Sequence, residues 1–566
     1  MTRLIYLNVK ISSTPEPSLE CIGFPEEMVG YFDPQRIHHE LDDPVLDLSE
    51  FTREDLDMLL VHRGNCPIQD YTPGYLALMD ALFPKSAIEF IGEQERCVQQ
   101  ALESLKRYPV FFNISELGAG KTEMTTAMAQ QLGLPILIVS TASIRSVWDS
   151  MRYSRYSKVA YHSFSQIRIA KHTDFLIRSG KSFVVSDTYR HLVTQGICLV
   201  CDECHHIKNA TQQRLAMETL IHPIISSPGR SVVVMLSATP FDKEEHAYHF
   251  MRTIGFCNDD PITKLRPKCP PATGLNQILE HCASLNPDAT LQCRRTYYYD
   301  YEDDPMTRKD AIQLIYDLYC KVLKGTLVNG CKKPELIAQR RIINTFYTLN
   351  EDELEMYRDG ARLLDQVERG EDRSIGSLMR GCYQTHKAML RSIASNIQGI
   401  LSQDCHAKVI VYMTYLDTYT ELEKRLTSTG TLIPSEIEML HGTSSFETRA
   451  RVIASFNAPN DRLRVLLVGL RVGGTGLNLQ DIHGGYTRHS FILPSYHYLE
   501  MHQASGRTWR PGSQSDSHIY YTYCEQVQLV RLFDSLVQKG TTVNETVSDV
   551  QGHILNASEY ESSHFG

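Results

Sequence analysis

Long apolar runs and clustered cysteines are both missing from this chain of 566 residues. No uninterrupted apolar segment approaches the roughly 18 residues that a membrane-spanning helix needs. The opening residues, MTRLIYLNVKISS, contain too few apolar side chains for a secretory signal. The 15 cysteines are scattered, which is typical of reduced thiols rather than of a disulfide framework. These absences predict an intracellular protein, in the nucleus or the cytoplasm, with no membrane partner.

An excess of basic charge is also absent, because the net charge is −10 at pH 7. Such a chain is not coated with positive surface, but a local cleft can still be basic enough to hold nucleic acid. The CxxC pair Cys201 and Cys204 shares Cys201 with the pair Cys198 and Cys201, and no separate pair lies nearby to complete a zinc site. The length predicts about three or four domain-sized units.

A glycine-rich stretch, SELGAGKT at Ser115–Thr122, lies between an apolar run and a helix-compatible run. Gly118 and Gly120 let the backbone N–H groups turn toward phosphate oxygens, at the start of a helix that adds partial positive charge. Lys121 would reach the β- and γ-phosphates, and the Thr122 hydroxyl would hold Mg²⁺. The residues expected to line the nucleotide are Glu116, Leu117, Gly118, Ala119, Gly120, Lys121 and Thr122. Taken alone, the stretch could also be an ordinary turn before a helix.

Gln94 lies upstream, on a predicted helix that begins near Ala87. Its amide could read the edge of an adenine with two hydrogen bonds, or it could be a surface glutamine. After the loop, the apolar run LPILIVST predicts a buried strand that ends in polar groups. Thr141, Ser143 and Arg145 follow that strand, where they could touch a phosphodiester backbone.

Two further apolar runs end in groups with possible chemistry. The first, Ile197–Cys201, is followed by Asp202, which would take Mg²⁺, and Glu203, which would orient the attacking water. The second, VVVMLSATP, contains small residues that could bond the acidic pair and report its state to the nucleic-acid side; they are Ser237, Ala238 and Thr239. His205 could couple the two runs, although a lone histidine is often structural.

The order of these motifs resembles a superfamily-two helicase-like ATPase of the Swi/Snf-type branch. SELGAGKT matches motif I, DECH motif II and SAT motif III, while PILIVSTASIRSVWDSM looks like motif Ia. INTFYTLNEDELEMYRDGARLL resembles the segment that returns from a helical protrusion to the second lobe, and VGGTGLNLQ resembles motif V. Gln503, Gly506, Arg507 and Arg510 fit motif VI, Q..GR..R.

The arginines of motif VI have a clear physical purpose. Charge builds on the γ-phosphoryl oxygens during transfer, and guanidinium groups delivered from an opposing lobe stabilise that charge. Arg507 and Arg510 are three residues apart and would share one face of a helix. The resemblance also implies that Gly476 and Gln503 contact the nucleotide. It places nucleic acid beside His441, Gly442, Thr443, Gly474 and Thr475.

Three departures separate this chain from the family pattern. Ser115 replaces the usual acidic residue, SAT replaces a Gly-Thr version of motif III, and Thr508-Trp509 stands where Ala-His is frequent. The stretch DIHGGYTRHSFILP looks more like helicase-type proteins of large DNA viruses than like chromatin remodellers. Packaging in a virion is therefore a third expected location.

The resemblance covers about residues 87–525 and implies an α/β fold with two RecA-like parallel-sheet lobes. We expect an N-terminal accessory region at 1–85, lobe one at 86–255, a helical insertion at 256–395, lobe two at 396–525 and a C-terminal brace or tail at 526–566.

The implied function is an ATP-dependent translocase or helicase that uses ATP and Mg²⁺ and binds nucleic acid, DNA in preference to RNA. A DExH RNA helicase or a transcription-associated NTPase of a virus is an alternative. A non-catalytic nucleic-acid-binding scaffold is a second alternative, and a P-loop kinase is a third. The intact lysine, acidic pair and arginines disfavour the scaffold, and a kinase would not need the glycine and arginine motifs of the second lobe.

Overall fold

The computed structural model describes most of the chain from residue 87 to residue 547. The gaps within it are 155–158, 171–174, 228, 259–272, 299–305, 370, 373, 474–476 and 528. Outside this range it describes strands β1 (Val9–Ile11), β2 (Leu19–Gly23), β3 (Ile37–Glu40), β4 (Asp43–Asp47) and β19 (Glu561–Phe565). The first four form an antiparallel sheet in the order β1-β2-β4-β3. A search of the described helices finds none with the length and apolarity of a bilayer span.

The first lobe is built on a six-stranded sheet in which every neighbouring pair is parallel. Its order is β12 (Val328–Asn329), β5 (Val110–Asn113), β11 (Val232–Leu236), β10 (Cys198–Asp202), β6 (Ile136–Ser140) and β7 (Val159–Ser163). The central strands are apolar along their whole length because helices cover both faces of the sheet. All strands point the same way, so the polar residues that follow β5, β6, β10 and β11 meet at one edge.

Alternate residues of each strand enter two separate cores. Ile136 and Ile138 face α3 (Gln94–Arg107), α4 (Lys121–Leu132) and α5 (Arg145–Ser154). Leu137 and Val139 face the opposite group of helices. That group comprises α6 (Phe164–Ile169), α7 (Asp187–Gln195), α8 (Gln212–Ser226) and α9 (Glu245–Thr253). A short hairpin, β8 (Leu176–Ser179) and β9 (Ser182–Val185), lies beside α8.

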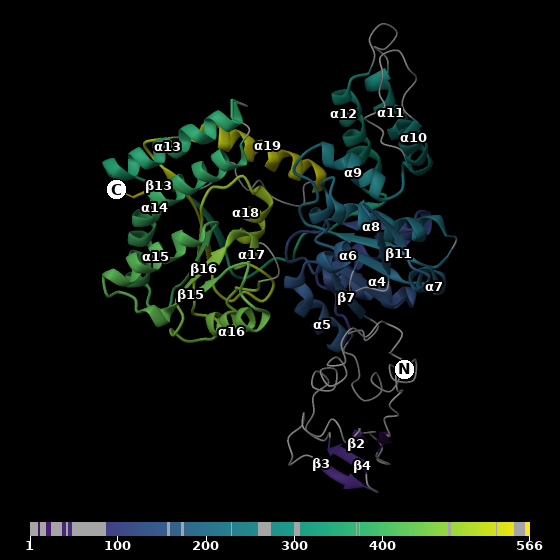
Figure 1. The fold of residues 1–566 in the computed structure, drawn as a ribbon, viewed down its shortest axis with the longest axis horizontal. Helices are drawn as coiled ribbons and strands as arrows, with labels where there is room; N and C mark the ends of the chain where they lie inside the picture. The colour runs from purple at the N-terminus through teal and green to yellow at the C-terminus, as the bar shows by residue number, and fades with distance from the viewer. Residues whose placement is uncertain are drawn as a thin grey trace.

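The second lobe has a seven-stranded sheet that is also parallel throughout. Its order is β15 (Ile437–Leu440), β16 (Val465–Gly469), β14 (Lys408–Met413), β17 (Arg488–Ile492), β18 (Ser517–Cys524), β13 (Arg340–Tyr347) and β19. Its helices are α13 (Glu351–Glu368), α14 (Ile375–Gln403), α15 (Leu416–Ser428), α16 (Phe446–Asn457), α17 (Leu470–Gly473) and α18 (Tyr498–Ser505). Figure 1 shows the two lobes side by side, with the second in green and yellow. The predicted α/β fold of two RecA-like lobes is confirmed.

The stretch expected to be a helical insertion also supplies strands. Helices α10 (Thr273–Leu285), α11 (Pro287–Tyr298) and α12 (Arg308–Leu318), with the π-helix η6 (Tyr319–Leu323), stand with α9 above the first sheet (Figure 1). After them, β12 joins the first sheet and β13 joins the second. The chain therefore crosses between the lobes at residues 330–339. The five-part division of the chain stays a prediction.

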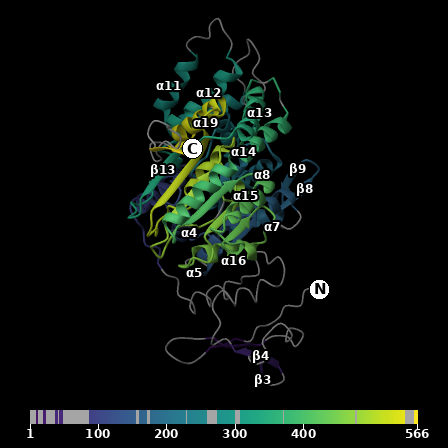
Figure 2. The same ribbon diagram turned by 90° about the vertical axis from the view of Figure 1, so that its left-hand side faces the viewer.

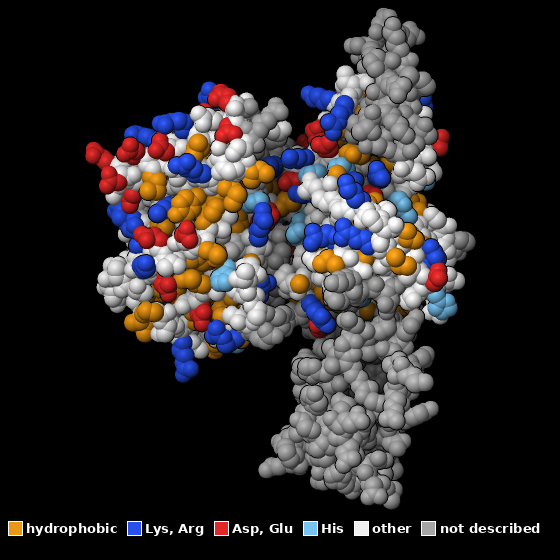
Figure 3. Space-filling view, viewed as in Figure 1, with side chains coloured by type: hydrophobic (Ala, Val, Ile, Leu, Met, Phe, Trp, Pro, Cys, Tyr) orange, Lys and Arg blue, Asp and Glu red, His pale blue; other side chains and the backbone are white. Residues whose placement is uncertain are grey.

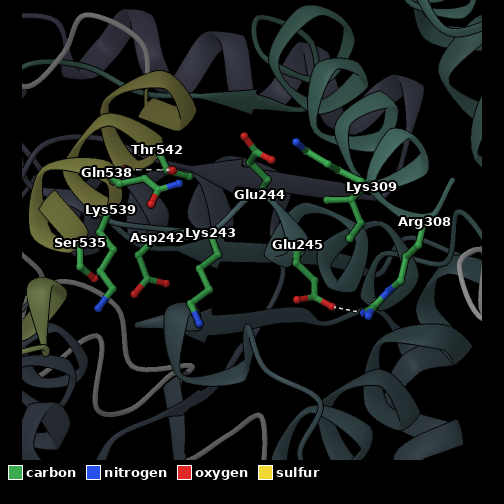
Figure 4. Close-up of a pocket in the computed structure, with 11 residues that line it drawn as sticks. Asp242, Lys243, Glu244, Glu245, Arg308, Lys309, Ser535, Gln538, Lys539 and Thr542 are labelled. Carbon is green, nitrogen blue, oxygen red and sulfur yellow. Dashed lines mark hydrogen bonds and ion pairs between the residues drawn. The ribbon is translucent and has the colours of Figure 1, made fainter. Parts of the chain in front are cut away.

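The C-terminal helix α19 (Val530–Val547) touches both lobes. Leu532 and Leu536 belong to the core of the second lobe, whereas Val547 belongs to a core of the first. The Tyr316 hydroxyl on α12 donates to Glu545 Oε2 at 2.9 Å. Figure 2 shows α19 lying beside both α12 and α13. A cavity of about 570 Å³ is lined by α19, by the first residues of α12 and by residues 242–245, and its lining mixes both signs of charge (Figure 4).

Candidate functional site

The glycine-rich loop leaves the end of β5 and enters α4, as its sequence predicted. Ser115 is fully buried, and its hydroxyl donates to Asn113 Oδ1 at 2.6 Å. The Ser115 hydroxyl oxygen also accepts a hydrogen bond from the backbone N–H of Cys331 at 3.0 Å. The departure from the family pattern at Ser115 therefore has a structural reason, since its small hydroxyl joins the loop to the segment that connects the lobes.

Two glycines carry the loop through left-handed conformations, with φ of 81° at Gly118 and 83° at Gly120. Gln94 packs directly on this turn, where its Nε2 donates to the Ala119 carbonyl at 2.9 Å. A Cβ atom on Gly120 would lie 2.4 Å from that nitrogen, so a larger residue would displace the Gln94 side chain and would also strain the left-handed backbone. Gln94 thus supports the loop backbone, and its contact with adenine stays a prediction.

Lys121 and Thr122 occupy the first turn of α4 and are both half-buried. Lys121 Nζ donates to the carbonyls of Ser115 at 2.9 Å and Glu116 at 3.1 Å. Burial lowers the pKa of Lys121, and the nearby charges of Glu203 and Asp202 oppose that shift. The Lys121 ammonium could bind an anionic ligand, and the nearby carboxylates could bind a cation that accompanies it.

Asp202 ends β10 and is held by two hydrogen bonds. The indole Nε1 of Trp148, on α5, donates to Oδ2 at 2.8 Å, and the backbone N–H of Glu203 donates to Oδ1 at 2.8 Å. Burial and the charge of Glu203 raise the pKa of Asp202 to about 7. A buried carboxylate beside a second carboxylate is stabilised by a hard cation, so the donor set of Asp202 and Thr122 fits Mg²⁺.

Glu203 sits at the centre of the site in an unusual conformation, with φ of 53°. Among the described residues only Ala170 shares a positive φ without being glycine. Glu203 Oε2 lies 3.3 Å from His205 Nδ1 and 3.3 Å from Nε2 of Gln503, which is on α18 of the second lobe. Burial opposes the charge of Glu203, but the hydrogen bond and charge of His205, with Arg507 and Lys121, outweigh it and lower the pKa to about 2. Glu203 is therefore an ionised acceptor.

His205 connects the acidic pair to the next strand end. Its Nδ1 also lies 3.3 Å from the Ser237 hydroxyl, and that hydroxyl accepts the backbone N–H of Thr239 at 3.2 Å. Ser237, Ala238 and Thr239 are all buried after β11. The predicted coupling residues are thus brought together, but Ser237 reaches Glu203 through His205 rather than directly.

The predicted arginines face the first lobe. Arg507 is 3% exposed; burial lowers its pKa, and the charge of Glu203 opposes the shift. Burial and the neighbouring charge of Arg507 lower the pKa of Arg510 to about 9. Arg510 donates to the Gly506 carbonyl at 3.2 Å and to the Asn478 side chain, which orient its guanidinium.

Direct packing joins the phosphate loop to this arginine segment. A Cβ atom on Gly118 would lie 3.2 Å from Pro511 Cδ and 3.6 Å from Arg510 Cγ. A Cβ atom on Gly506 would lie 3.1 Å from Leu117 Cδ1. The glycines at these positions allow the two lobes to touch. The lysine, the acidic pair and both arginines therefore share one junction between the sheets.

The described residues predicted to touch nucleic acid follow β6 and β15. The hydroxyls of Thr141 and Ser143 are 3.0 Å apart, and Arg145 pairs with Asp149 at 3.3 Å on the exposed face of α5. In the second lobe, His441 Nδ1 lies 2.8 Å from the Thr443 hydroxyl, and the Gly442 carbonyl accepts from Arg449. Gly474, Thr475 and Gly476 lie outside the described residues.

Three site residues were missed from the sequence. Trp148 stands within the quoted motif Ia stretch, but nothing local indicates that its indole reaches Asp202. Asn478, in the motif V stretch, reaches Arg510. Lys333 lies in the crossing segment and has no motif of its own. Trp148 and Asn478 lie inside recognised motifs, so their motif position is the sequence signal that could have identified them.

Comparison with known proteins agrees with this geometry. The sequence model of the helicase conserved C-terminal domain matches residues 392–512. A protein of Acanthamoeba polyphaga mimivirus named as an ATP-dependent RNA helicase is 21% identical over 75% of this chain and 76% of its own length. The DNA repair protein rhp54 of Schizosaccharomyces pombe is 28% identical over 27% of this chain and 16% of its own length.

The human RAD54-like DNA repair and recombination protein is 31% identical over 20% of this chain and 14% of its own length. Among solved structures, the Sulfolobus solfataricus SWI2/SNF2 ATPase core in complex with double-stranded DNA has a TM-score of 0.28 and 14% identity. That similarity covers 77% of this chain and 88% of that one. The second lobe thus matches the helicase conserved C-terminal domain, and the relatives that this chain resembles are named as an RNA helicase and as DNA repair proteins of the RAD54 type.

Proposed function

We propose that this chain is a translocase of duplex DNA that hydrolyses ATP at the junction of its two parallel sheets. The contact between Gln503 and Glu203 carries the proposal, because Nε2 and Oε2 lie 3.3 Å apart across the two lobes. Glu203, which would orient the attacking water, lies in the first lobe, and Gln503 of motif VI in the second lobe donates a hydrogen bond to it. Nucleotide binding and release can then be coupled to opening and closing of the lobes.

The nucleotide would lie on the first lobe. The backbone from Glu116 to Gly120 would surround its phosphates, Lys121 would pair with the β- and γ-phosphates, and Gln94 would reach the adenine. Gly476 and Gln503 would close over it from the second lobe. Thr122 and Asp202 would hold Mg²⁺, which when bound neutralises charge on the β- and γ-oxygens.

The chemical step would use groups from both lobes. Glu203 is ionised and buried, so its carboxylate can accept a hydrogen bond from the attacking water and orient it. Arg507 and Arg510 would stabilise the charge that grows on the γ-phosphoryl oxygens. Glu203 contacts His205, and His205 contacts Ser237 at the end of β11. A change at Glu203 during hydrolysis could therefore shift the residues that follow β11.

The nucleic acid would run along the face formed by α5 and α16. Thr141, Ser143 and Arg145 precede or begin α5, and the loop from His441 to Thr443 precedes α16. Both views place these helices at the same lower end of the two lobes (Figures 1 and 2). Lys and Arg side chains flank the junction of the lobes in Figure 3. The RAD54-like relatives, named for DNA repair and recombination, favour DNA as the substrate.

A panel of nucleic acids tests the proposal. ATP hydrolysis by the purified full chain is measured with double-stranded DNA, single-stranded DNA and RNA, and we expect double-stranded DNA to stimulate it most. Glu203→Gln should abolish the stimulated hydrolysis, because the neutral amide lacks the negative charge that orients the attacking water. Full activity in Glu203→Gln would refute the role of Glu203, and the absence of any stimulation would refute a motor.

An RNA helicase is the second candidate, since the mimivirus relative that covers three quarters of this chain is named as one. The same panel separates the two candidates. Stimulation that is greatest with RNA would replace the DNA translocase with this alternative.

A further inference from the structure

The segment that crosses between the lobes is bonded at its start to the phosphate loop. The backbone N–H of Glu116 donates to the Cys331 carbonyl at 3.0 Å, and the N–H of Lys333 donates to Glu116 Oε2 at 3.1 Å. A Cβ atom on Gly330 would lie 2.6 Å from the Ser115 backbone nitrogen. The start of the crossing therefore moves with the loop that would hold the phosphates.

The far end of the same crossing is bonded to the second lobe. The indole Nε1 of Trp509 donates to the Ala338 carbonyl at 2.8 Å. The N–H of Gln339 donates to Asp516 Oδ1 at 2.8 Å, and its carbonyl accepts from Ser517 at 2.9 Å. Trp509 stands between Arg507 and Arg510 in the sequence, so this end of the crossing moves with the arginine motif.

One side chain connects the two ends. Lys333 is 6% exposed at its side chain, its Nζ lies 3.1 Å from the centre of the Trp509 ring, and it is 3.6 Å from Glu116 Oε1. The guanidinium of Arg340 lies 4.6 Å from the centre of the same ring. Burial and the charge of Arg340 lower the pKa of Lys333 to about 7, while Glu116 favours the charged form. A buried ammonium on an indole face is attracted more strongly than one in water, because no solvent competes for its charge.

We propose that Lys333 is a positioning residue that clasps Trp509 to Glu116 and so sets the arginines of the second lobe according to the state of the phosphate loop. The inference rests on the proposed function, since it assigns Arg507 and Arg510 to the hydrolytic step. It also accounts for Trp509, which stands where the family pattern has a histidine. An imidazole would offer the ammonium a smaller face.

Lys333→Met tests the clasp, because it keeps an unbranched apolar side chain and removes only the charge. We expect the maximal rate of stimulated ATP hydrolysis, kcat, to fall about tenfold while KM for ATP stays within about twofold. Lys333→Arg keeps a cation that can lie on the ring and should recover most of kcat. The matched control is Lys332→Met, since Lys332 is the exposed neighbour in the same segment.

Tryptophan fluorescence gives a readout that does not depend on hydrolysis. The chain has two tryptophans, so Trp148→Phe leaves Trp509 as the single emitter; because Trp148 bonds to Asp202, Mg²⁺ is supplied at a concentration that saturates this variant. We expect its emission to change when a non-hydrolysable ATP analogue is added with Mg²⁺, and this response to be lost when Lys333→Met is added. Thermal unfolding of each variant confirms that it is folded.

Two results would overturn the clasp: an unchanged kcat in Lys333→Met, or an equal loss in Lys332→Met. A Trp509 response that persists in Lys333→Met would also overturn it. Failure of the proposed function looks different. In that case the unmodified chain hydrolyses no ATP with any nucleic acid, while the Trp509 response to the analogue still reports on Lys333.

Discussion

Glu203 holds a left-handed backbone that a non-glycine residue adopts at a cost of about 1–3 kcal/mol. The conformation turns its carboxylate toward His205 in its own lobe and Gln503 in the other. Such strain persists where surrounding contacts over-determine it, and both of these partners contribute. At the scale of single residues, the site is thus defined by which side chains reach Glu203 from each lobe.

Arg507 is the residue on which the transition state should depend most. Its guanidinium is buried and faces the charge of Glu203. We expect Arg507→Ala to lower kcat by about a thousandfold or more, with a much smaller effect on KM for ATP, because its charge acts on the transition state. Arg462→Ala, on the exposed surface of the second lobe, is the control. Steady-state kinetics with unchanged kcat in Arg507→Ala would exclude it as a finger.

At the scale of elements, α5 and β10 are joined by the hydrogen bond from Trp148 to Asp202. This bond links the helix that begins with the predicted nucleic-acid residue Arg145 to the predicted metal carboxylate. The bond therefore connects the predicted nucleic-acid site and the predicted metal site, which the sequence places on separate segments.

Removing the indole N–H should weaken the hold on Asp202. We expect Trp148→Phe to raise the Mg²⁺ concentration needed for half-maximal ATP hydrolysis about threefold to tenfold, because a lost hydrogen bond to a charged group is worth about 1.5 kcal/mol or more. Trp509→Phe should leave the Mg²⁺ requirement unchanged, since its indole bonds to Ala338. Titration of Mg²⁺ at saturating ATP measures the difference, and an unaltered requirement in Trp148→Phe would remove Trp148 from the metal site.

At the scale of the whole molecule, the crossing segment and α19 join the described parts of the two lobes, in addition to the direct contacts at the site. Leu532 and Leu536 bury one part of α19 in the second lobe, and Val547 enters a core of the first. Tyr316 and Lys324 of the first lobe both bond to Glu545 near its end. The helix therefore restrains how far the lobes can separate.

Val547→Asp should detach the end of α19 from the first lobe, because a fully buried carboxylate without a partner costs several kcal/mol. Calorimetry should then show separate unfolding of the two lobes, and stimulated hydrolysis should fall. Val537→Asp is the matched control, since that side chain is 48% exposed on the same helix. A single unfolding transition in Val547→Asp, like that of the control, would contradict a joining role for α19.

The sequence alone determined the fold class and most of the chemistry of the first lobe. SELGAGKT could be recognised because a phosphate loop is local: its strand, glycines and helix start lie within a few residues of one another. The apolar runs before Asp202 and Ser237 were equally readable, because strands buried on both faces exclude polar residues. Motif VI was recognised by its spacing, although its partner across the junction was not visible.

Tertiary structure alone decided which of these groups meet. The contacts of Gln503 with Glu203, Trp148 with Asp202 and Lys333 with Trp509 each join segments far apart in the chain. The strands β12 and β13 were missed because β12 has only two residues, and β13 overlaps a stretch that the resemblance identified as a return to the second lobe and not as a strand. Local patterns specify how a segment folds, but strand order and the approach of the lobes determine its neighbours, and no local pattern encodes those.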